Sequence, residues 1–334
     1  MSRSYTFKIT SEEAGQRLDE FLASRFGGLS RMRIAGLLGR GAGRVASGPG
    51  LPGYRLAPGD MVEFLIDEPA SSAMRPEPVP LEIIHEDDHI LVVVKPSGML
   101  VHPTKSVKSG TLANALTYHL NRAFYDDPAS RAVLEAGDEA PGLARPGLVH
   151  RLDRATSGLM VIAVTPRALS VLSRHFHRRL VEKRYLAVVR GGGLGQAGVI
   201  RAPIGRDPDR RPQWGVMESG RPSETRFRVL SEGPGATLVE LEPVTGRTNQ
   251  LRIHLAHAGH PVIGDELYGP GAGDQGSEPG LRLCLHAWRL AFHHPSGGEW
   301  MEFTSPLPRD MEEASEEMAG APGQLAPGPR PLLL

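Results

Sequence analysis

Six short apolar segments separated by polar loops run through residues 81–308, and they limit most strongly what this chain can fold into. Each has four to eight residues rich in Val, Leu and Ile, which is the length and composition of a β-strand. They span residues 81–84, 90–95, 158–164, 184–190, 237–244 and 288–292. One helix is well marked, because Thr165 can cap its start and Pro166 can occupy its first turn. Residues 81–308 are therefore predicted to form an α+β domain on a mixed, largely antiparallel sheet.

The N-terminal residues 1–66 predict a second, smaller α/β module. Leu18, Phe21, Leu22 and Phe26 recur at helical spacing, and a second helix with the sequence RMRIAGLLGR follows shortly after. The Pro- and acid-rich segment 67–80 is typical of a linker. The Pro- and Gly-rich residues 309–334 are expected to be a disordered tail.

The composition argues against several classes of protein. No stretch approaches the ~18 to 20 uninterrupted apolar residues of a membrane span, and the N-terminus lacks the apolar core of a secretory signal. The single cysteine, Cys284, excludes an internal disulfide and a cysteine-based zinc cluster. We therefore expect a cytoplasmic globular protein that does not associate with membranes.

Charge is balanced overall but unevenly distributed. The chain has 38 basic and 38 acidic residues, yet residues 142–184 hold nine Arg or Lys against Asp153 and Glu182. Residues 201–228 add seven Arg against four carboxylates. Such segments suit a nucleic-acid partner, because Lys and Arg replace the counterions of phosphates. A merely solvated surface in an Arg-rich sequence, with 33 Arg and five Lys, is the alternative.

The segment HRLDRATSG at residues 150–158 places one carboxylate among basic neighbours. An apolar strand follows it, so we expect a loop that presents His150, Arg151, Asp153 and Arg154 at one rim of the sheet. Cationic neighbours lower a carboxyl pKa and keep the group anionic, as a carboxylate nucleophile requires. The motif alone leaves open an ordinary loop salt bridge.

This loop resembles the catalytic loop of the RluA-type RNA pseudouridine synthases, and five further segments resemble that family in the expected order. They are VVVKPSGMLVHP at 92–103, EKRYLAVVRG at 182–191, RAPIGRDPDRR at 201–211, GRTNQLRIHLAHAGHPVIGDELYG at 246–269 and LHAWRLAFHHP at 285–295. The resemblance implies a pseudouridine synthase fold over residues 81–308 and the isomerisation of specific uridines in structured RNA. Within residues 1–66, RLDEFLASRF, SRMRI and PGDMVEF resemble the S4-type RNA-binding domain, which implies RNA contacts by Arg31, Arg33 and Arg40.

The resemblance implies three catalytic residues. Asp153 would attack the target nucleoside, after which the glycosidic carbon–nitrogen bond breaks, the uracil turns, and its carbon 5 bonds to the ribose. Whether the first adduct forms at the base or at the ribose stays open. Tyr185 would pack on the base and help to remove the proton from carbon 5, and Arg247 would pair with the carboxylate. Because the bond is exchanged within one nucleotide, neither a metal nor a cofactor is expected.

Five further residues are assigned to substrate binding. Arg151 would enter the RNA stack in place of the extruded nucleotide, with a plain phosphate contact as the alternative. His150 is expected to organise the loop by hydrogen bonding, with Arg154 beside Asp153, and Leu251 and Ile253 would line the apolar side of the base pocket. An S4-like module ahead of such a domain resembles the enzymes of large-subunit ribosomal RNA, with tRNA as the alternative substrate. We expect a monomer.

Other functions compete with this interpretation. An RNA-binding or ribosome-assembly factor that kept the fold without the activity would not need Asp153, Tyr185 and Arg247. A glycosidase that used Asp153 lacks an evident second carboxylate. The three-residue spacing of His254, His257 and His260 suggests zinc, but Gly259 ends a helix before the third histidine, so no metal site is predicted.

Overall fold

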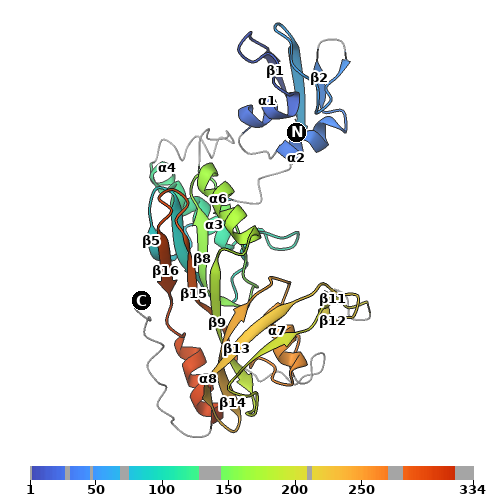
Figure 1. Ribbon diagram of the computed structural model, residues 1–334. Helices are drawn as coiled ribbons and strands as arrows, with labels where there is room; N and C mark the ends of the chain where they lie inside the picture. Colours follow the sequence, from blue (N-terminus) through green and yellow to red (C-terminus); the bar gives the residue numbers. More distant parts are fainter. Residues whose placement is uncertain are drawn as a thin grey trace. The chain divides into compact units, whose positions relative to one another are not determined.

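The computed structural model describes residues 2–26, 31–45, 48–67, 75–127, 144–208, 213–269 and 281–319 (Figure 1). The chain divides into two compact units, Met1–Ser72 and Ala73–Leu334. The division falls inside the predicted linker, but residues 75–80 of that segment belong to the second unit. Asn114 holds them there, because its Nδ2 donates to the carbonyl of Arg75 at 2.7 Å and its own carbonyl accepts from the amide of Glu77 at 3.2 Å. No helix in these described ranges has the length and apolarity needed to cross a membrane.

The first unit is an antiparallel sheet with the strand order β1-β4-β2-β3 and two helices. Its elements are β1 (Ser2–Lys8), α1 (Leu18–Arg25), α2 (Arg31–Leu38), β2 (Gly43–Val45), β3 (Gly48–Pro49) and β4 (Met61–Asp67). Leu18, Phe21 and Leu22 of α1 are buried and Phe26 packs against the same core, as their spacing predicted. Residues of α2 and β4 complete this core, which is separate from those of the second unit.

The second unit is built on one mixed sheet, which has ten strands within the described residues. The strand order is β10-β13-β14-β9-β15-β8-β6-β5, with β16 beside β15 and β7 beside β8. All pairs are antiparallel except β8 with β15. The strands are β5 (Glu82–Glu86), β6 (Ile90–Lys95), β7 (Gly147–Leu148), β8 (Ser157–Ala163), β9 (Glu182–Arg190), β10 (Ala197–Arg201), β13 (Glu224–Glu232), β14 (Ala236–Pro243), β15 (Leu285–His293) and β16 (Trp300–Thr304), and β11 (Ile204–Arg206) pairs with β12 (Trp214–Val216) separately. The predicted fold class, α+β with a mixed and largely antiparallel sheet, is confirmed.

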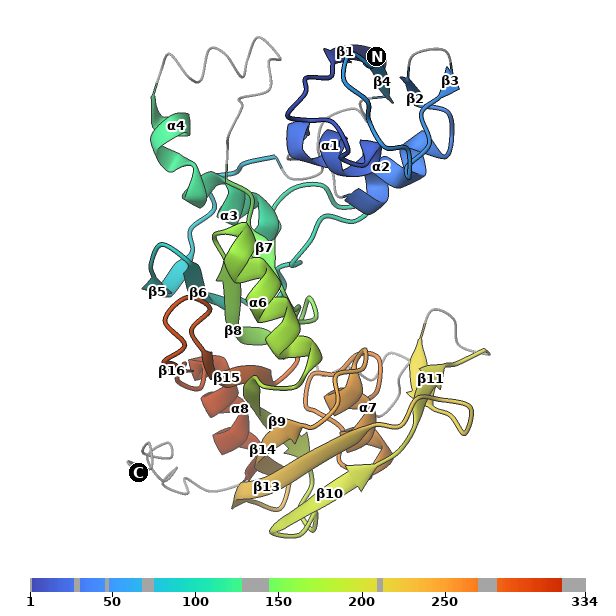
Figure 2. The same cartoon turned by 45° about the horizontal axis from the view of Figure 1, so that its top comes forward.

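Helices cover both faces of this sheet around β6 and β8 (Figure 2). The helices are α3 (Leu112–Leu120), α4 (Arg122–Asp126), α6 (Pro166–His177), α7 (Gln250–His257) and α8 (Arg309–Ala319). Val92 shares a core with Leu172 of α6, while the next residue, Val93, shares another core with Leu116 of α3. Successive strand residues point to opposite faces, so both faces of β6 are buried, which explains its unbroken apolar sequence. The predicted cap of α6 is confirmed, because Thr165 accepts a hydrogen bond from the amide of Ala168.

Gly158 lies where β8 meets β15, the parallel pair that joins the two halves of the sheet. Its φ of +119° lies in a region that L side chains rarely adopt, and a Cβ there would come within 2.3 Å of the carbonyl oxygen of Ala287. The final glycine of the HRLDRATSG segment is therefore required by the close approach of another strand.

The predicted disordered tail is corrected at its start, because residues Arg309–Ala319 form α8. Met311 and Ala314 are buried in the core formed with β9 and β14. The charged residues between them conceal this face in the sequence, and burial of the apolar side chains stabilises a helix that composition alone argues against. The remaining residues of the predicted tail, 320–334, lie outside the described residues.

Candidate active site

The loop that carries Asp153 lies between β7 and β8 and is tied to the loop that follows β6. Lys95, at the end of β6, is fully buried, and its Nζ donates to three carbonyl oxygens, those of Pro96 (2.7 Å), Met99 (2.9 Å) and Arg154 (3.1 Å). The amide of Gly98 also donates to the carbonyl of Arg154 at 2.8 Å, and Arg154 Nε donates back to the Gly98 carbonyl at 2.9 Å. These bonds fix the backbone next to Asp153. Lys95 was not among the predicted site residues, although a lysine at the end of an apolar strand was a usable signal for it.

Asp153 is half-buried, with 27% of its side chain exposed. Burial raises the pKa of its carboxyl group, while the charges of Arg252, Arg151 and Lys95 lower it, and the balance leaves the pKa above its ordinary value. The expected lowering of this pKa is therefore wrong. Loss of hydration destabilises the anion by more than the cations stabilise it, and the nearby carboxylate of Asp265 opposes them further.

Arg252, on α7, is the arginine that faces Asp153, with 4.0 Å between Nη1 and Oδ2. The same guanidinium holds the buried carboxylate of Asp265 through two bonds, Nε to Oδ2 at 2.7 Å and Nη2 to Oδ1 at 2.5 Å. Its carbon Cζ also lies 5.0 Å from the ring centre of Tyr268. Asp265 and Tyr268 thus fix the orientation of Arg252 independently of Asp153. A charged residue between apolar neighbours of a short helix was the signal that the sequence offered for it.

Arg247, which was predicted to pair with Asp153, lies elsewhere. It precedes α7, its amide donates to Oε1 of Gln250 at 3.1 Å, and its Nη2 reaches the carbonyl of Pro222 at 3.4 Å. No ion pair joins it to Asp153, and both residues belong to the described part of the chain. The predicted pairing is corrected to Arg252. Arg247 precedes α7 and Arg252 lies within it, so their side chains have different surroundings.

Tyr185 lies on β9, half-buried between the two cores that meet there. Burial, followed by the negative charge of Asp153, raises the pKa of its phenol well above the ordinary value. The phenol is therefore neutral throughout the physiological range. Tyr185 packs against the same core as Leu152, the residue before Asp153, so it lies near the loop that carries Asp153.

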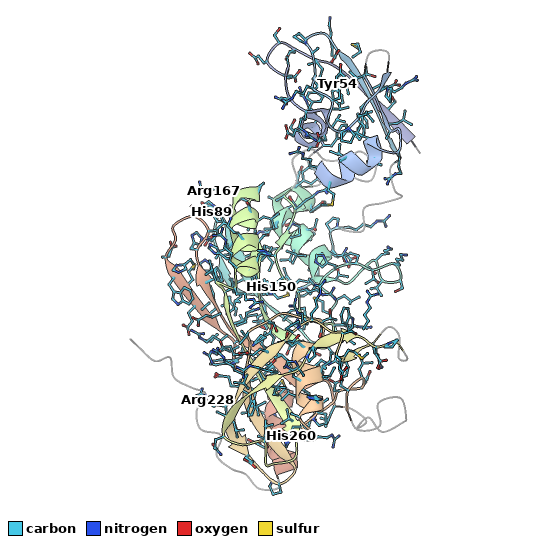
Figure 3. All side chains as sticks on the ribbon, turned by 45° about the vertical axis from the view of Figure 1, so that its right-hand side comes forward. Tyr54, His89, His150, Arg167, Arg228 and His260 are labelled. Atoms are coloured by element: carbon cyan, nitrogen blue, oxygen red, sulfur yellow. The ribbon has the colours of Figure 1, made fainter. Side chains whose placement is uncertain are left out.

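His150 has a structural position in the same loop (Figure 3). Its Nε2 accepts the amide of Val161 at 3.1 Å, and its ring stacks on Phe176 of α6 with 4.5 Å between the ring centres. Burial, and then the charge of Lys183, lower its pKa to about 3, so the imidazole is neutral. This geometry connects the loop to the sheet and to α6.

The other residues assigned to substrate binding divide into two groups. Arg151 and Arg154 are exposed at the loop, and Arg151 is close enough for its charge to act on Asp153. Leu251 and Ile253 are buried within α7, with 7% and 4% of their surface exposed. Leu251 packs in the core of the sheet, and the expected contact of Leu251 and Ile253 with the base stays a prediction.

Two of the three histidines in the series at the end of α7, His254 and His260, are held by hydrogen bonds. His254 Nδ1 bonds to Thr225 Oγ1 at 2.9 Å and its Nε2 to the carbonyl of Ala202 at 3.0 Å. His260 Nδ1 bonds to the carbonyl of Arg190 at 3.1 Å, and His257 is exposed. Among the described residues, no group of three or more His, Cys, Asp or Glu side chains is placed to hold a metal ion.

The basic residues predicted to contact RNA from α2 differ in their surroundings. Arg31 forms ion pairs with Asp19 and Glu20, both at 2.7 Å. Arg40 is exposed just after the helix, and the side chain of Arg33 lies outside the described residues.

Comparison with known proteins gives a consistent result. A family model described as RNA pseudouridylate synthase matches residues 89–257. The uncharacterized RNA pseudouridine synthase YlyB of Bacillus subtilis (strain 168) is 36% identical over 309 residues, 92% of this chain and 96% of its own length. Ribosomal large subunit pseudouridine synthase D of Nitrosomonas europaea is 35% identical over 317 residues, 92% of this chain and 86% of its own. Among solved structures, human RNA Pseudouridylate Synthase Domain Containing 1 is 30% identical with a TM-score of 0.53, covering 72% of this chain and 86% of that one.

The matched residues include Asp153, Tyr185 and Arg252, and the curated relatives extend over most of both units. The chain therefore belongs to the RNA pseudouridylate synthase family and is an isomerase.

Proposed function

We propose that this protein converts specific uridines of structured RNA into pseudouridine, with large-subunit ribosomal RNA as its substrate. The observation that carries the proposal is the half-buried Asp153, which faces Arg252 and shares its surroundings with Tyr185. The name of the relative from Nitrosomonas europaea supports ribosomal RNA as the substrate class. Mapping pseudouridines by carbodiimide-dependent stops, in cells with and without the gene, tests this choice against tRNA.

Asp153 is the proposed nucleophile. Its carboxylate attacks the target nucleoside, and the bond between the ribose and nitrogen 1 of uracil breaks. The base turns, its carbon 5 bonds to the ribose, carbon 5 loses its proton, nitrogen 1 gains one, and the carboxylate is released. Partial burial leaves the carboxylate less hydrated and so more reactive once it is ionised. Arg252 takes the electrostatic role that was assigned to Arg247, and Asp265 holds it in position.

Tyr185 is proposed to hold the extruded base against its ring. An aromatic face is the usual support for a base outside its stack. Removal of the proton from carbon 5 by the phenol would require Tyr185 to lose its own proton, which burial and Asp153 both oppose. Stacking is therefore the role that the electrostatics favour. Arg151, exposed beside Asp153, is proposed to enter the RNA stack at the vacated position.

The unit Met1–Ser72 is proposed to bind RNA, as its S4-like sequence pattern indicates. Arg40 and Arg44 are exposed on it and are suited to phosphate contacts. Arg31 contributes less than expected, because two carboxylates already neutralise it.

Asp153→Asn tests the proposed mechanism directly. An amide cannot act as the nucleophile, so tritium release from RNA labelled at carbon 5 of uridine should fall to background while RNA affinity stays within a few fold. Asp88→Asn is the matched control, because Asp88 is an exposed carboxylate of the same unit and its loss should leave the rate unchanged. Appreciable turnover by Asp153→Asn would rule out Asp153 as the nucleophile.

A further inference from the structure

A cavity of ≈ 540 Å³ in the second unit is lined by residues from the end of α6, β10, β13 and the loop before α7. Figure 2 labels these elements. Among the described residues, its wall contains Arg179, Arg201 and Arg247 together with a single carboxylate, Glu224. Asp153 is not among the lining residues, so this site is separate from the ion pair with Arg252. The volume lies within the range of pockets that bind small organic groups.

Arg247 contributes a guanidinium nitrogen without an acceptor. Among the described residues, its Nε is buried and has no hydrogen-bond partner, and its Nη2 makes only the long contact with the Pro222 carbonyl. A buried charged N–H group without an acceptor is costly and therefore rare in folded proteins. The amide of Arg247 donates to Oε1 of Gln250 at 3.1 Å, which fixes the backbone at this point of the wall.

Arg179 occupies a backbone position that normally takes glycine. It follows the C-cap of α6 with a φ of +59°, and the bonds from Leu180 to His175 (2.9 Å) and from Arg179 to Phe176 (3.2 Å) close the helix. Glycine is the usual residue at such a turn, because a Cβ strains the left-handed conformation. An arginine that accepts this strain and lines a cavity points to a role for its side chain.

Carboxylates neutralise the arginines just outside this cavity, whereas the arginines in its wall outnumber the carboxylates there. On β13, Arg226 pairs with Glu242 at 3.6 Å and Arg228 with Glu240 at 3.0 Å. Within the cavity, Glu224 is bonded to Arg201 at 2.8 Å. The wall therefore has a net positive charge, and guanidinium groups match the paired oxygens of a phosphate.

We infer that this cavity binds a backbone phosphodiester of the RNA substrate, close to the target uridine. The inference rests on the proposed function, and it names a second contact with the same RNA. Arg247 precedes Arg252 by five residues, so their Cα atoms are at most about 18 Å apart. The cavity is thus within reach of the nucleotides that flank a base placed at Asp153. The apolar lining from Ala202, Pro203 and Val244 suits the adjoining ribose.

The test replaces one phosphate at a time by a neutral methylphosphonate in a short RNA and measures binding to the full chain. One replacement, within a few positions of the target, should weaken binding to the wild type about ten-fold or more. The same replacement should change binding to the double variant Arg179→Gly/Arg247→Gln less than two-fold. The slope of log affinity against log salt should also fall by about 0.7 when one single-strand phosphate is no longer neutralised.

Arg179→Gly alone separates folding from binding. Glycine relieves the strain at φ +59°, so the Tm should be equal to or above that of the wild type while RNA affinity falls. Arg228→Gln is the control for the change in net charge, because Arg228 lies on β13 outside the cavity wall. It should leave the position-specific effect of the methylphosphonate intact.

Each outcome decides a separate point. A methylphosphonate scan without a position that depends on Arg179 and Arg247 overturns the inference. The scan could instead show no position-specific effect while inorganic phosphate raises the Tm of the wild type but not that of the double variant. This result would make the cavity a site for a free anion. A position-specific effect in an RNA that the wild type binds but does not isomerise would support the phosphate contact and count against the proposed function.

Discussion

At Asp153, burial raises the carboxyl pKa while Arg252, Arg151 and Lys95 lower it, and burial has the larger effect. The same residue is proposed to react as an anion, so burial makes the reacting form less stable than the same carboxylate would be in water. Active sites commonly sacrifice stability in this way. The three cations favour the ionised form of the carboxylate, and Lys95 combines this effect with its bonds to the loop backbone.

Stability should therefore depend on pH through Asp153. Its folded pKa lies above the unfolded value, so its contribution to stability is fully present below the ordinary value of 3.8 and is lost as pH rises through the raised value. Asp153→Asn cannot ionise and should have the higher Tm at pH 7, by about 2–4 °C for each kcal/mol gained. The difference should shrink toward pH 4 in calorimetric scans, while Asp88→Asn should follow the wild type. A lower Tm for Asp153→Asn at pH 7 would show that the cations outweigh burial.

Among the elements, β8 shows how a loop motif serves the sheet as well as the site. Gly158 ends the HRLDRATSG segment and lets β8 approach β15 closely. These two strands form the parallel pair that joins the two halves of the sheet. The loop with Asp153 and the junction of the sheet thus depend on the same few residues.

Gly158→Ala should destabilise the protein by about 2 kcal/mol or more, because it combines a strained φ with a clash against the Ala287 backbone. Urea denaturation followed by circular dichroism measures the change. Gly215→Ala on β12 is the control, since the nearest atom to its added Cβ is 4.0 Å away. Equal effects of the two substitutions would contradict the argument from close approach.

α8 connects the end of the described chain to the core of the second unit. Met311→Ala should cost about 2–5 kcal/mol, because its side chain is fully buried against β9 and β14. Glu316→Ala, at an exposed position of the same helix, should change the free energy of unfolding by less than about 0.5 kcal/mol. If Met311→Ala proved as mild as the control in chemical denaturation, α8 would not be part of the core in solution.

For the whole molecule, the two units have separate hydrophobic cores, so we expect the second unit to fold without the first. Deletion of residues 1–72 should weaken RNA binding. The slope of log affinity against log salt should fall by about 0.7–0.9 for each phosphate that the first unit neutralises. Slow activity on short substrates should persist, because Asp153, Tyr185 and Arg252 lie in the second unit. Arg40→Glu in the full chain should reduce the same slope, as measured by binding titrations at several salt concentrations. An unchanged slope after both changes would argue against RNA binding by the first unit.

Local signals in the sequence were sufficient for β5, β6, β8, β9, β14 and β15, for the capped helix at Thr165 and for the loop that presents Asp153, but not for β7, β10, β13 and β16. These features depend on hydrophobic periodicity, caps and turns, which act over a few residues. The composition of residues 309–319 gave a wrong prediction at α8, because the apolar face of that helix stabilises it only when it packs against the strands that it covers.

The tertiary structure alone decided which arginine faces Asp153, the direction of the Asp153 pKa shift and the placement of Arg247 in a separate cavity. Lys95, Asp153 and the pair Arg252–Asp265 come from three separate segments, and the distances between them follow from the packing of the sheet and α7. The motif identified the residue types required for the chemistry. The burial of Asp153, its distance to Arg252 and its pKa depend on sums of interactions with neighbours that are remote in sequence. Those sums exist only once the chain has folded.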